Sequence, residues 1–243
     1  MYMGIDGCPG GWLAVGIDES GDWSVNVAEG LLVLLTAETS LSSCLIDMPI
    51  GLPGANSSAV RSCDILARKH LGCRRASVFS PPVREVLDCL EYETANGRSR
   101  QLTGRGISRQ AWNLRHKITE LDGLLRAWPG MQQQVRECHP ELAFAELLGS
   151  PLPVSKKTEA GRSLREQLLQ GVYSETTAVV EFCRKQYKRC TVRSDDVLDA
   201  LALAVLAWRG RGCYASLPAE PEYDSVGLPM EIVCGLSARE GSF

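Results

Sequence analysis

The chain has 243 residues, of which 44% are apolar, and a mean hydropathy of −0.07, values that fit a globular protein and exclude a disordered one. No apolar run approaches the roughly 18–20 residues that a membrane span needs, so we expect no membrane association. The net charge of −3 by itself disfavours nucleic acid as a partner, but the charge is unevenly distributed. Residues 1–60 have seven acids and no Lys or Arg, whereas residues 61–130 have thirteen Lys or Arg against seven acids. Two acidic ends therefore flank a basic middle.

The first half of the chain begins with a pattern of short strands. Turn-forming residues separate apolar or alternating stretches, which predicts strands over 2–6, 12–17 and about 23–27. Residues 31–42 fit a short helix. The apolar run 44–48 predicts a fourth strand, which the two prolines within 49–53 end.

The remainder of the chain is mostly helical in pattern. We predict helices over 57–71, 84–90, 108–128, 140–148, 158–170, 174–188 and 195–209, with Ser194 as the N-cap of the last one. Residues 96–106 are predicted to be a loop. Residues 132–138 predict a fifth strand, and the tail predicts one or two short strands, of which 230–234 is the clearest.

This order of elements predicts an α/β fold with a mixed five-stranded sheet flanked by helices. We expect one domain over residues 1–243, with a helical insertion at about 54–130 between the fourth and fifth strands. The ten cysteines form no C-x-x-C pair and the N-terminus lacks a secretory pattern, so free thiols and a cytoplasmic location are expected.

Acidic residues stand where strands of the predicted sheet end. Asp6, Asp47 and Glu137 lie at or near the carboxyl ends of three strands, the edge at which open α/β sheets bind ligands. Asp196 and Asp199 share one face in the first turn of an otherwise apolar helix, which should be buried against the sheet. These side chains are therefore expected to converge.

Converging carboxylates repel one another unless their pKa values rise or a cation lies between them. Asp6, Asp47, Asp196 and Asp199 predict a site for Mg²⁺ or Mn²⁺, the hard ions that carboxylate oxygens suit. Two such ions about 3.5–4 Å apart would clamp a phosphodiester and activate water. In the alternative interpretation, the strand-end aspartates bond to turn amides and the helical ones cap the helix.

Glu137 and His139 follow the fifth strand and are further candidates for catalysis. A histidine there could carry a proton near neutral pH. The alternative is a pair of side chains that bond to the backbone and serve only the structure.

Basic residues supply candidates for phosphate binding. Arginine suits bidentate contact with phosphate, and two lysines before a helix make a plausible anion site. The alternative for each is a solvated charge on the surface. The candidates are Arg74, Arg75, Lys156, Lys157, Arg162 and Arg165.

Five motifs resemble those of the predicted RNase H-like nucleases, also called domain-of-unknown-function family 429. They are G-I-D-G-C-P-G-G-W at 4–12, I-D-M-P-I-G-L-P at 46–53, E-C-H-P-E-L-A-F at 137–144, S-K-K-T-E-A-G-R at 155–162 and D-D-V-L-D-A-L at 195–201. The resemblance covers most of the chain. It implies an RNase H-like fold and two-metal phosphodiester hydrolysis, with Asp6, Asp47, Asp196 and Asp199 at the positions of the superfamily's acids. Because resolvase relatives act as dimers, it also implies a homodimer.

Three functions follow from these patterns. The first is a metal-dependent nuclease acting on nucleic acid of unspecified type. The second is a nucleotide-binding phosphoryl-transfer enzyme of the actin-like ATPase type, with residues 7–11 as a phosphate hairpin. The third is a binding module for nucleic acid or a partner, without catalysis.

Overall fold

The computed structural model describes residues 1–38, 40–55 and 60–237. Its main sheet has five strands in the order β3-β2-β1-β4-β5, with β1 antiparallel to β2, β2 antiparallel to β3, and β1–β4 and β4–β5 parallel. The predicted mixed five-stranded sheet is therefore confirmed. Its strands are β1 (Tyr2–Cys8), β2 (Gly11–Ile17), β3 (Trp23–Ala28), β4 (Ser43–Ile46) and β5 (Val135–Glu137).

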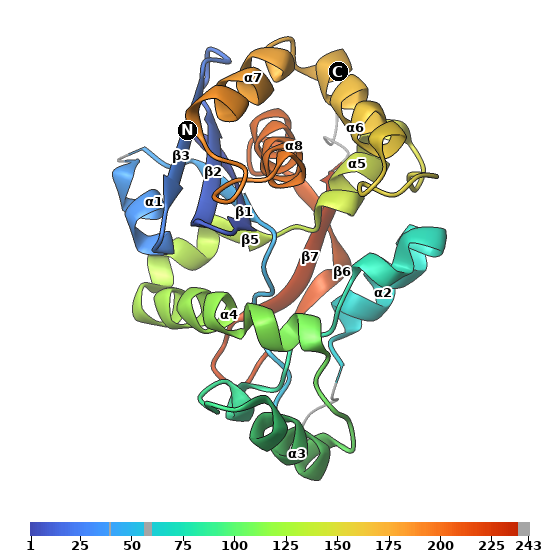
Figure 1. Cartoon of the computed structure of the whole chain (residues 1–243). Helices are drawn as coiled ribbons and strands as arrows, with labels where there is room; N and C mark the ends of the chain where they lie inside the picture. The colour runs from blue at the N-terminus through green and yellow to red at the C-terminus, as the bar shows by residue number, and fades with distance from the viewer. Residues whose placement is uncertain (39, 56–59, 238–243) are drawn as a thin grey trace.

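Helices cover both faces of this sheet (Figure 1). On one face α8 (Ser194–Gly210) packs along β1 and β2, surrounded by α5 (Pro140–Leu148), α6 (Glu159–Val172) and α7 (Thr176–Gln186). On the other face lie α1 (Leu31–Ala37) and α4 (Arg109–Ala127). The period of two in β2 fits this arrangement, since Leu13 and Val15 join the α8 core while Trp12 and Ala14 join the α1–α4 core.

The connection between β4 and β5 is helical. It comprises α2 (Ser62–Leu71), η1 (Gly72–Ser77), η2 (Arg84–Val86), α3 (Tyr92–Thr103), α4 and η3 (Pro129–Gln133). The start of the helix predicted over 57–71 falls on residues 57–59, which lie outside the described residues. The helix predicted over 84–90 is a single 3-10 turn.

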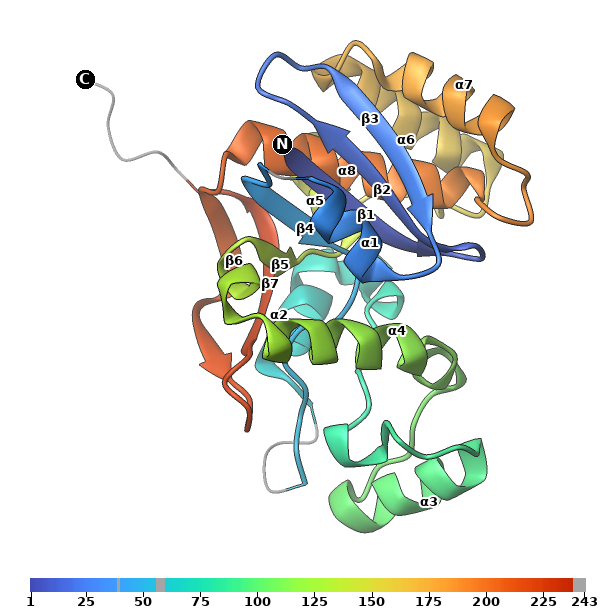
Figure 2. The same ribbon diagram turned by 90° about the vertical axis from the view of Figure 1, so that its left-hand side faces the viewer.

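The loop predicted over 96–106 is wrong, because most of it belongs to α3. Asn, Gly and Ser favour loops locally, but tertiary contacts hold these residues helical. Ala95 and Ser99 are buried, and the backbone N–H of Ile107 donates to Asn96 Oδ1 over 2.9 Å. Figures 1 and 2 both show α3 at the end of the molecule opposite to α7.

The tail forms a longer hairpin than its sequence indicated. Strands β6 (Tyr214–Tyr223) and β7 (Pro229–Leu236) pair antiparallel as a separate two-stranded sheet. Strand β6 contains Pro218 and Pro221, which cannot donate to a ladder, and its pairing is irregular between Leu217 and Glu222. A bridge between Cys138 and Val233 links β7 to the end of β5, so the hairpin stands beside the sheet (Figure 2).

Among the described helices, none is both long and apolar enough to cross a membrane.

Candidate functional site

The carboxyl ends of β1 and β4 place two aspartates side by side. These strands are parallel neighbours with Ile5 opposite Ile46, and the N–H of Asp47 continues the ladder by donating to the carbonyl of Ile5 over 2.9 Å. Asp6 and Asp47 therefore leave adjacent strands at the same sheet edge. The prediction that strand ends would bring them together is confirmed.

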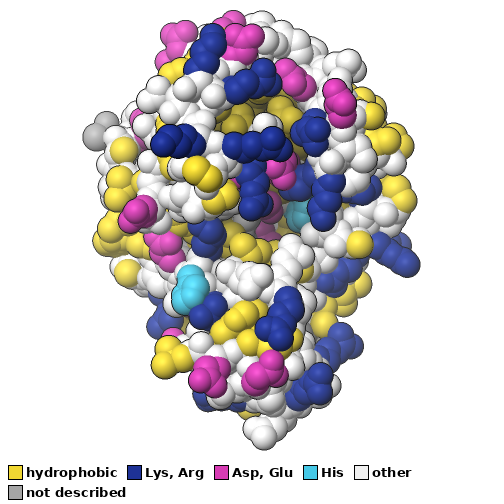
Figure 3. Space-filling model, viewed as in Figure 1, with side chains coloured by type: hydrophobic (Ala, Val, Ile, Leu, Met, Phe, Trp, Pro, Cys, Tyr) yellow, Lys and Arg dark blue, Asp and Glu magenta, His cyan; other side chains and the backbone are white. Residues whose placement is uncertain are grey.

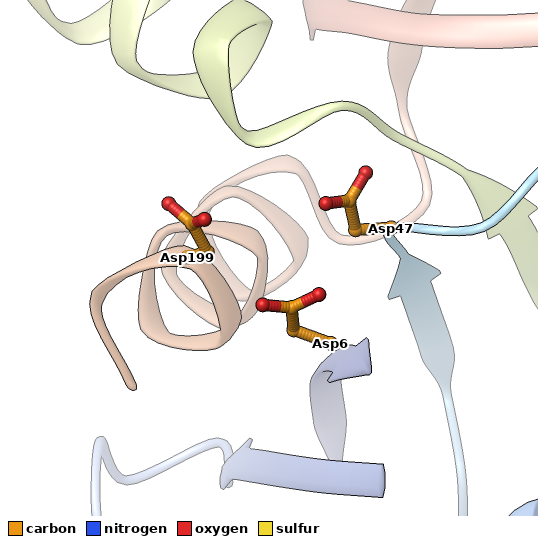
Figure 4. Close-up of side chains that lie close together, drawn as sticks. All are labelled: Asp6, Asp47 and Asp199. Atoms are coloured by element: carbon orange, nitrogen blue, oxygen red, sulfur yellow. The ribbon is translucent and has the colours of Figure 1, made fainter. Parts of the chain in front are cut away.

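A glycine in β1 lets α8 bring a third carboxylate to the same point. A Cβ atom at Gly4 would lie 2.1 Å from the carbonyl oxygen of Ala200, so the backbone of α8 rests directly on β1. Asp199, next to Ala200, is thereby held against the strand ends. Asp6, Asp47 and Asp199 each offer an oxygen within 4.8 Å of the others, and Figure 4 shows this triad.

The triad is short of positive charge. Asp6 and Asp199 are 8% and 1% exposed. Burial, followed by the charges of Asp47 and Asp199, raises the pKa of Asp6 well above its ordinary value, with Lys156 opposing the shift. Burial likewise raises the pKa of Asp199 to about 6 against the opposing charge of Lys156. A further cation among these oxygens would relieve both shifts.

Lys156 supplies one cation from the segment that precedes α6. Its ammonium forms an ion pair with Asp199 Oδ2. Burial lowers the pKa of Lys156, but the charges of Asp199 and Asp6 outweigh it and raise the pKa above its usual range. Lys156 was predicted to bind substrate phosphate, and the structure places it in contact with the acids as well.

Asp196 lies apart from the triad, although its sequence position predicted a fourth metal ligand. Its Oδ2 accepts the backbone N–H of Arg193 over 2.9 Å, at the start of α8. Burial raises its pKa, and that hydrogen bond partly opposes the rise. Arg193, not Ser194, is the N-cap residue, since the Asp196 carboxylate three residues on satisfies its N–H.

Glu137 is held by a buried arginine rather than facing a substrate. Both of its oxygens accept from Arg61, over 2.7 and 2.8 Å, and one also accepts the N–H of Ile50 over 2.7 Å. Burial raises the pKa of Glu137 to about 7, with Arg61 opposing. Arg61 also pairs with Asp64 over 2.5 Å, so this network ties β5, α2 and the segment after Asp47 together.

His139 is the N-cap residue of α5. Its Nδ1 accepts the N–H of Glu141 over 3.1 Å, so the ring proton belongs on Nε2, which lies 3.2 Å from the carbonyl oxygen of Ser77. Both ring nitrogens are thus engaged by backbone groups. The interpretation of His139 as a structural residue fits these contacts.

A cavity of about 380 Å³ opens beside the triad. Asp6 and Asp47 line it together with His139, Glu141 and the apolar side chains of Phe79 and Leu114; its cationic lining is Arg74, Lys156 and Lys157. In Figure 3, Lys and Arg side chains surround a hollow in which acidic side chains lie. An acidic floor beneath a cationic rim can hold a metal ion and a phosphate at once.

The other three predicted phosphate ligands lie elsewhere. Arg165 is 1% exposed and pairs with Glu141 Oε1 over 2.6 Å, so its buried guanidinium cannot reach a substrate phosphate. Arg75 is exposed and does not line this cavity. Arg162 lines a neighbouring hollow.

The sequence interpretation missed Glu141 as a residue of the site and did not foresee that Lys117 lies beside residues 7–11. Glu141 is 4% exposed and adds a carboxylate to the cavity; its Oε2 has no hydrogen-bond partner within the described part of the chain. Lys117 of α4 donates to the carbonyl of Gly11 and lies against Gly7, and burial lowers its pKa. The proximity of Glu141 to His139 in the chain was the one available signal, whereas nothing local relates Lys117 to residues 7–11.

Comparison with known proteins assigns the chain to a family but gives no activity for it. Neither the curated proteins nor the solved structures contain a significant match to the chain. The sequence model of the family described as "Protein of unknown function (DUF429)" matches residues 4–223, a span that includes Asp6, Asp47 and Asp199. The chain therefore belongs to the DUF429 family.

Proposed function

We propose that the protein is an RNase H-like, divalent-metal-dependent hydrolase that cleaves phosphodiester bonds in nucleic acid. The observation that carries the proposal is the buried triad of Asp6, Asp47 and Asp199 beside a cavity with a cationic rim. The strand order β3-β2-β1-β4-β5, with β3, β2 and β1 antiparallel and β4 and β5 parallel, supports the RNase H-like assignment.

The donor set of the triad fits Mg²⁺ or Mn²⁺. All three ligands offer carboxylate oxygen, which hard divalent ions prefer. The raised pKa values of Asp6 and Asp199 favour added positive charge, and Lys156 provides only one cation. When bound there, the metal supplies Lewis acidity to the phosphate and lowers the pKa of a water molecule.

The protein's own side chains account for substrate placement. Lys156, Lys157 and Arg74 line the rim, where their N–H groups can donate to phosphate oxygens. Lys156 contacts Asp199 and the cavity alike, so it can hold a phosphate directly above the triad. We assign no chemical step to Glu137, because Arg61 and Ile50 already engage both of its oxygens.

Cleavage assays test this proposal. Purified protein with Mg²⁺ or Mn²⁺ is incubated with single-stranded, duplex, hybrid and branched oligonucleotides, alongside Asp47→Asn. We expect the wild type to cleave at least one substrate, leaving a 5′-phosphate, and the variant to cleave none. If the wild type cleaves none of them, or if the two proteins cleave equally, the proposal is wrong.

Metal binding is tested separately by Mn²⁺ calorimetry. Asp6→Asn and Asp199→Asn should lose Mn²⁺ binding. Asp195→Asn is the matched control, since Asp195 lies on the same helix one turn before Asp199 but outside the triad. Equal binding by all three variants would remove the triad as the metal site.

A further inference from the structure

A second hollow lies at the start of α8, beside the cavity already described. It measures about 340 Å³ and is lined by Arg162 of α6, by Arg189 and Arg193 from the segment between α7 and α8, and by Ser194 and Asp195. Three arginines thus line one small space. Within its described lining, Asp195 is the one acid.

These arginines differ from the largely buried arginines of the fold. Arg61, Arg84 and Arg165 are all committed to ion pairs with carboxylates that are largely buried. Over residues 1–38, 40–55 and 60–237, no salt bridge involves Arg162, Arg189 or Arg193; the guanidinium of Arg162 donates once, to the Lys157 carbonyl over 3.2 Å. Their remaining N–H donors are free for an anion.

The arginine hollow adjoins the cavity of the triad. Lys157 lines that cavity, and the hydrogen bond from Arg162 to its carbonyl joins the two linings. The start of α8 connects them as well, because Asp195 lines the arginine hollow and Asp199, one turn further along the helix, belongs to the triad. An extended phosphodiester chain can therefore contact both places.

A hollow of about 250 Å³, lined by both apolar and basic side chains, continues from the arginines between α7 and α8. It shares Arg189, Arg193 and Ser194 with the arginine hollow. Its further lining residues are Tyr187, Arg184, Cys183, Val180, Val192 and Val197. A phosphate held by the arginines would bring its attached sugar and base to Tyr187 and the valines of this lining. Tyrosine offers a ring face that any base can contact.

We infer that these two hollows bind the nucleotide next to the cleaved bond of a single-stranded nucleic acid. Its phosphate lies among Arg162, Arg189 and Arg193, and its base enters the hollow beside Tyr187. A base in that hollow must be unpaired, which selects a single strand over a duplex. The inference rests on the proposed function, since the triad defines where the neighbouring phosphate is cleaved.

Binding measurements test the inference without any cleavage. Full-length protein in EDTA is titrated with labelled single-stranded DNA and RNA oligonucleotides and with a duplex of equal length, over a series of salt concentrations. The test variant is Arg189→Met/Arg193→Met. The control is Arg98→Met/Arg100→Met, which removes the same charge from exposed positions on α3.

We expect the test variant to bind the single strand at least tenfold more weakly than the wild type. The salt dependence of its affinity should weaken by about 0.7 in slope, because one lost phosphate contact contributes roughly 0.7 for single strands. The control should retain wild-type affinity. Equal affinities of the two double variants would overturn the inference, and so would duplex binding as tight as single-strand binding.

A second assay keeps this result separate from the proposed function. Hydrolysis of bis(p-nitrophenyl) phosphate by the wild type with Mn²⁺ needs no neighbouring nucleotide and reports on the triad. Arginine-dependent binding without this hydrolysis would refute the nuclease while retaining the strand-binding site. Hydrolysis without arginine-dependent binding would refute the strand-binding site while retaining the nuclease.

Discussion

Replacing Lys156 by methionine should tighten metal binding while it weakens catalysis. The ammonium of Lys156 is paired with Asp199, so a divalent ion must compete with it for that carboxylate. Methionine keeps much of the apolar stem and removes the charge. The metal then binds without displacing a cation, but the rim of the cavity loses a donor to the substrate phosphate.

The size of the effect follows from the burial of the pair. The side chain of Asp199 is 2% exposed and that of Lys156 is 35% exposed. Exposed pairs contribute about 0.2–1 kcal/mol, whereas breaking a buried pair costs about 3–5 kcal/mol. Because solvent reaches Lys156, we reduce the strength of this ion pair to about 1–2 kcal/mol. Removing the competing ammonium should then lower the Kd for Mn²⁺ by about 5–30-fold.

Calorimetric titration with Mn²⁺ at about pH 8.5 measures this change, since the raised pKa values of Asp6 and Asp199 then matter least. Lys157→Met is the matched control, because Lys157 lines the same cavity and, across the described ranges, forms no ion pair. Its Mn²⁺ affinity should equal that of the wild type. Unchanged or weaker Mn²⁺ binding by Lys156→Met would refute competition between the ammonium and the metal.

Three further substitutions test the electrostatics and packing of the site. Asp6→Asn should stabilise the metal-free protein at about pH 8 by roughly 0.5–2 kcal/mol. Because the folded-state pKa of Asp6 is raised, its protonation stabilises the fold below the unfolded-state pKa, and this contribution is lost as pH rises through the folded-state value. The difference in the free energy of unfolding between Asp6→Asn and the wild type, measured in urea, should therefore vanish at about pH 4. An equal difference at both pH values would contradict a raised pKa of Asp6 in the folded state. Glu137→Gln should lower the free energy of unfolding in urea by about 2–4 kcal/mol, because the buried charge of Arg61 loses its partner. Its affinity for Mn²⁺ should persist. Unchanged stability would argue against a structural role for Glu137. Gly4→Ala places a Cβ 2.1 Å from a backbone oxygen of α8, so it should lower the free energy of unfolding by at least about 1–3 kcal/mol and weaken Mn²⁺ binding. Gly97→Ala is the control, because its Cβ would meet no atom within 4 Å, and it should have neither effect.

The local sequence pattern was sufficient to predict most strands of the main sheet. In β1–β3 the turn residues and the alternation of side chains are properties of neighbours in the chain, so the strands and the placement of Asp6 at a strand end could be predicted. The position of Asp47 followed in the same way. Helix α3 was missed because its own residues favour a loop, and its stability depends on contacts such as the edge-on packing of Tyr92 against Trp112.

The roles of the acids could not be separated by spacing alone. Asp196 and Asp199 lie three residues apart, and either could have faced the strands. The contact of the α8 backbone with Gly4 decides that Asp199 joins Asp6 and Asp47, while Asp196 bonds to the start of its own helix. That contact joins residues nearly 200 positions apart in the chain.

The sequence by itself determined that acids would stand at the ends of buried strands and in the first turn of an apolar helix, because these are local properties. Only the tertiary structure decided which of them meet. It paired Glu137 with Arg61, 76 residues away, and brought Lys156 to Asp199, 43 residues away. Such pairings depend on how helices pack over the sheet, and the energy that selects them is shared among many long-range contacts that no short motif records.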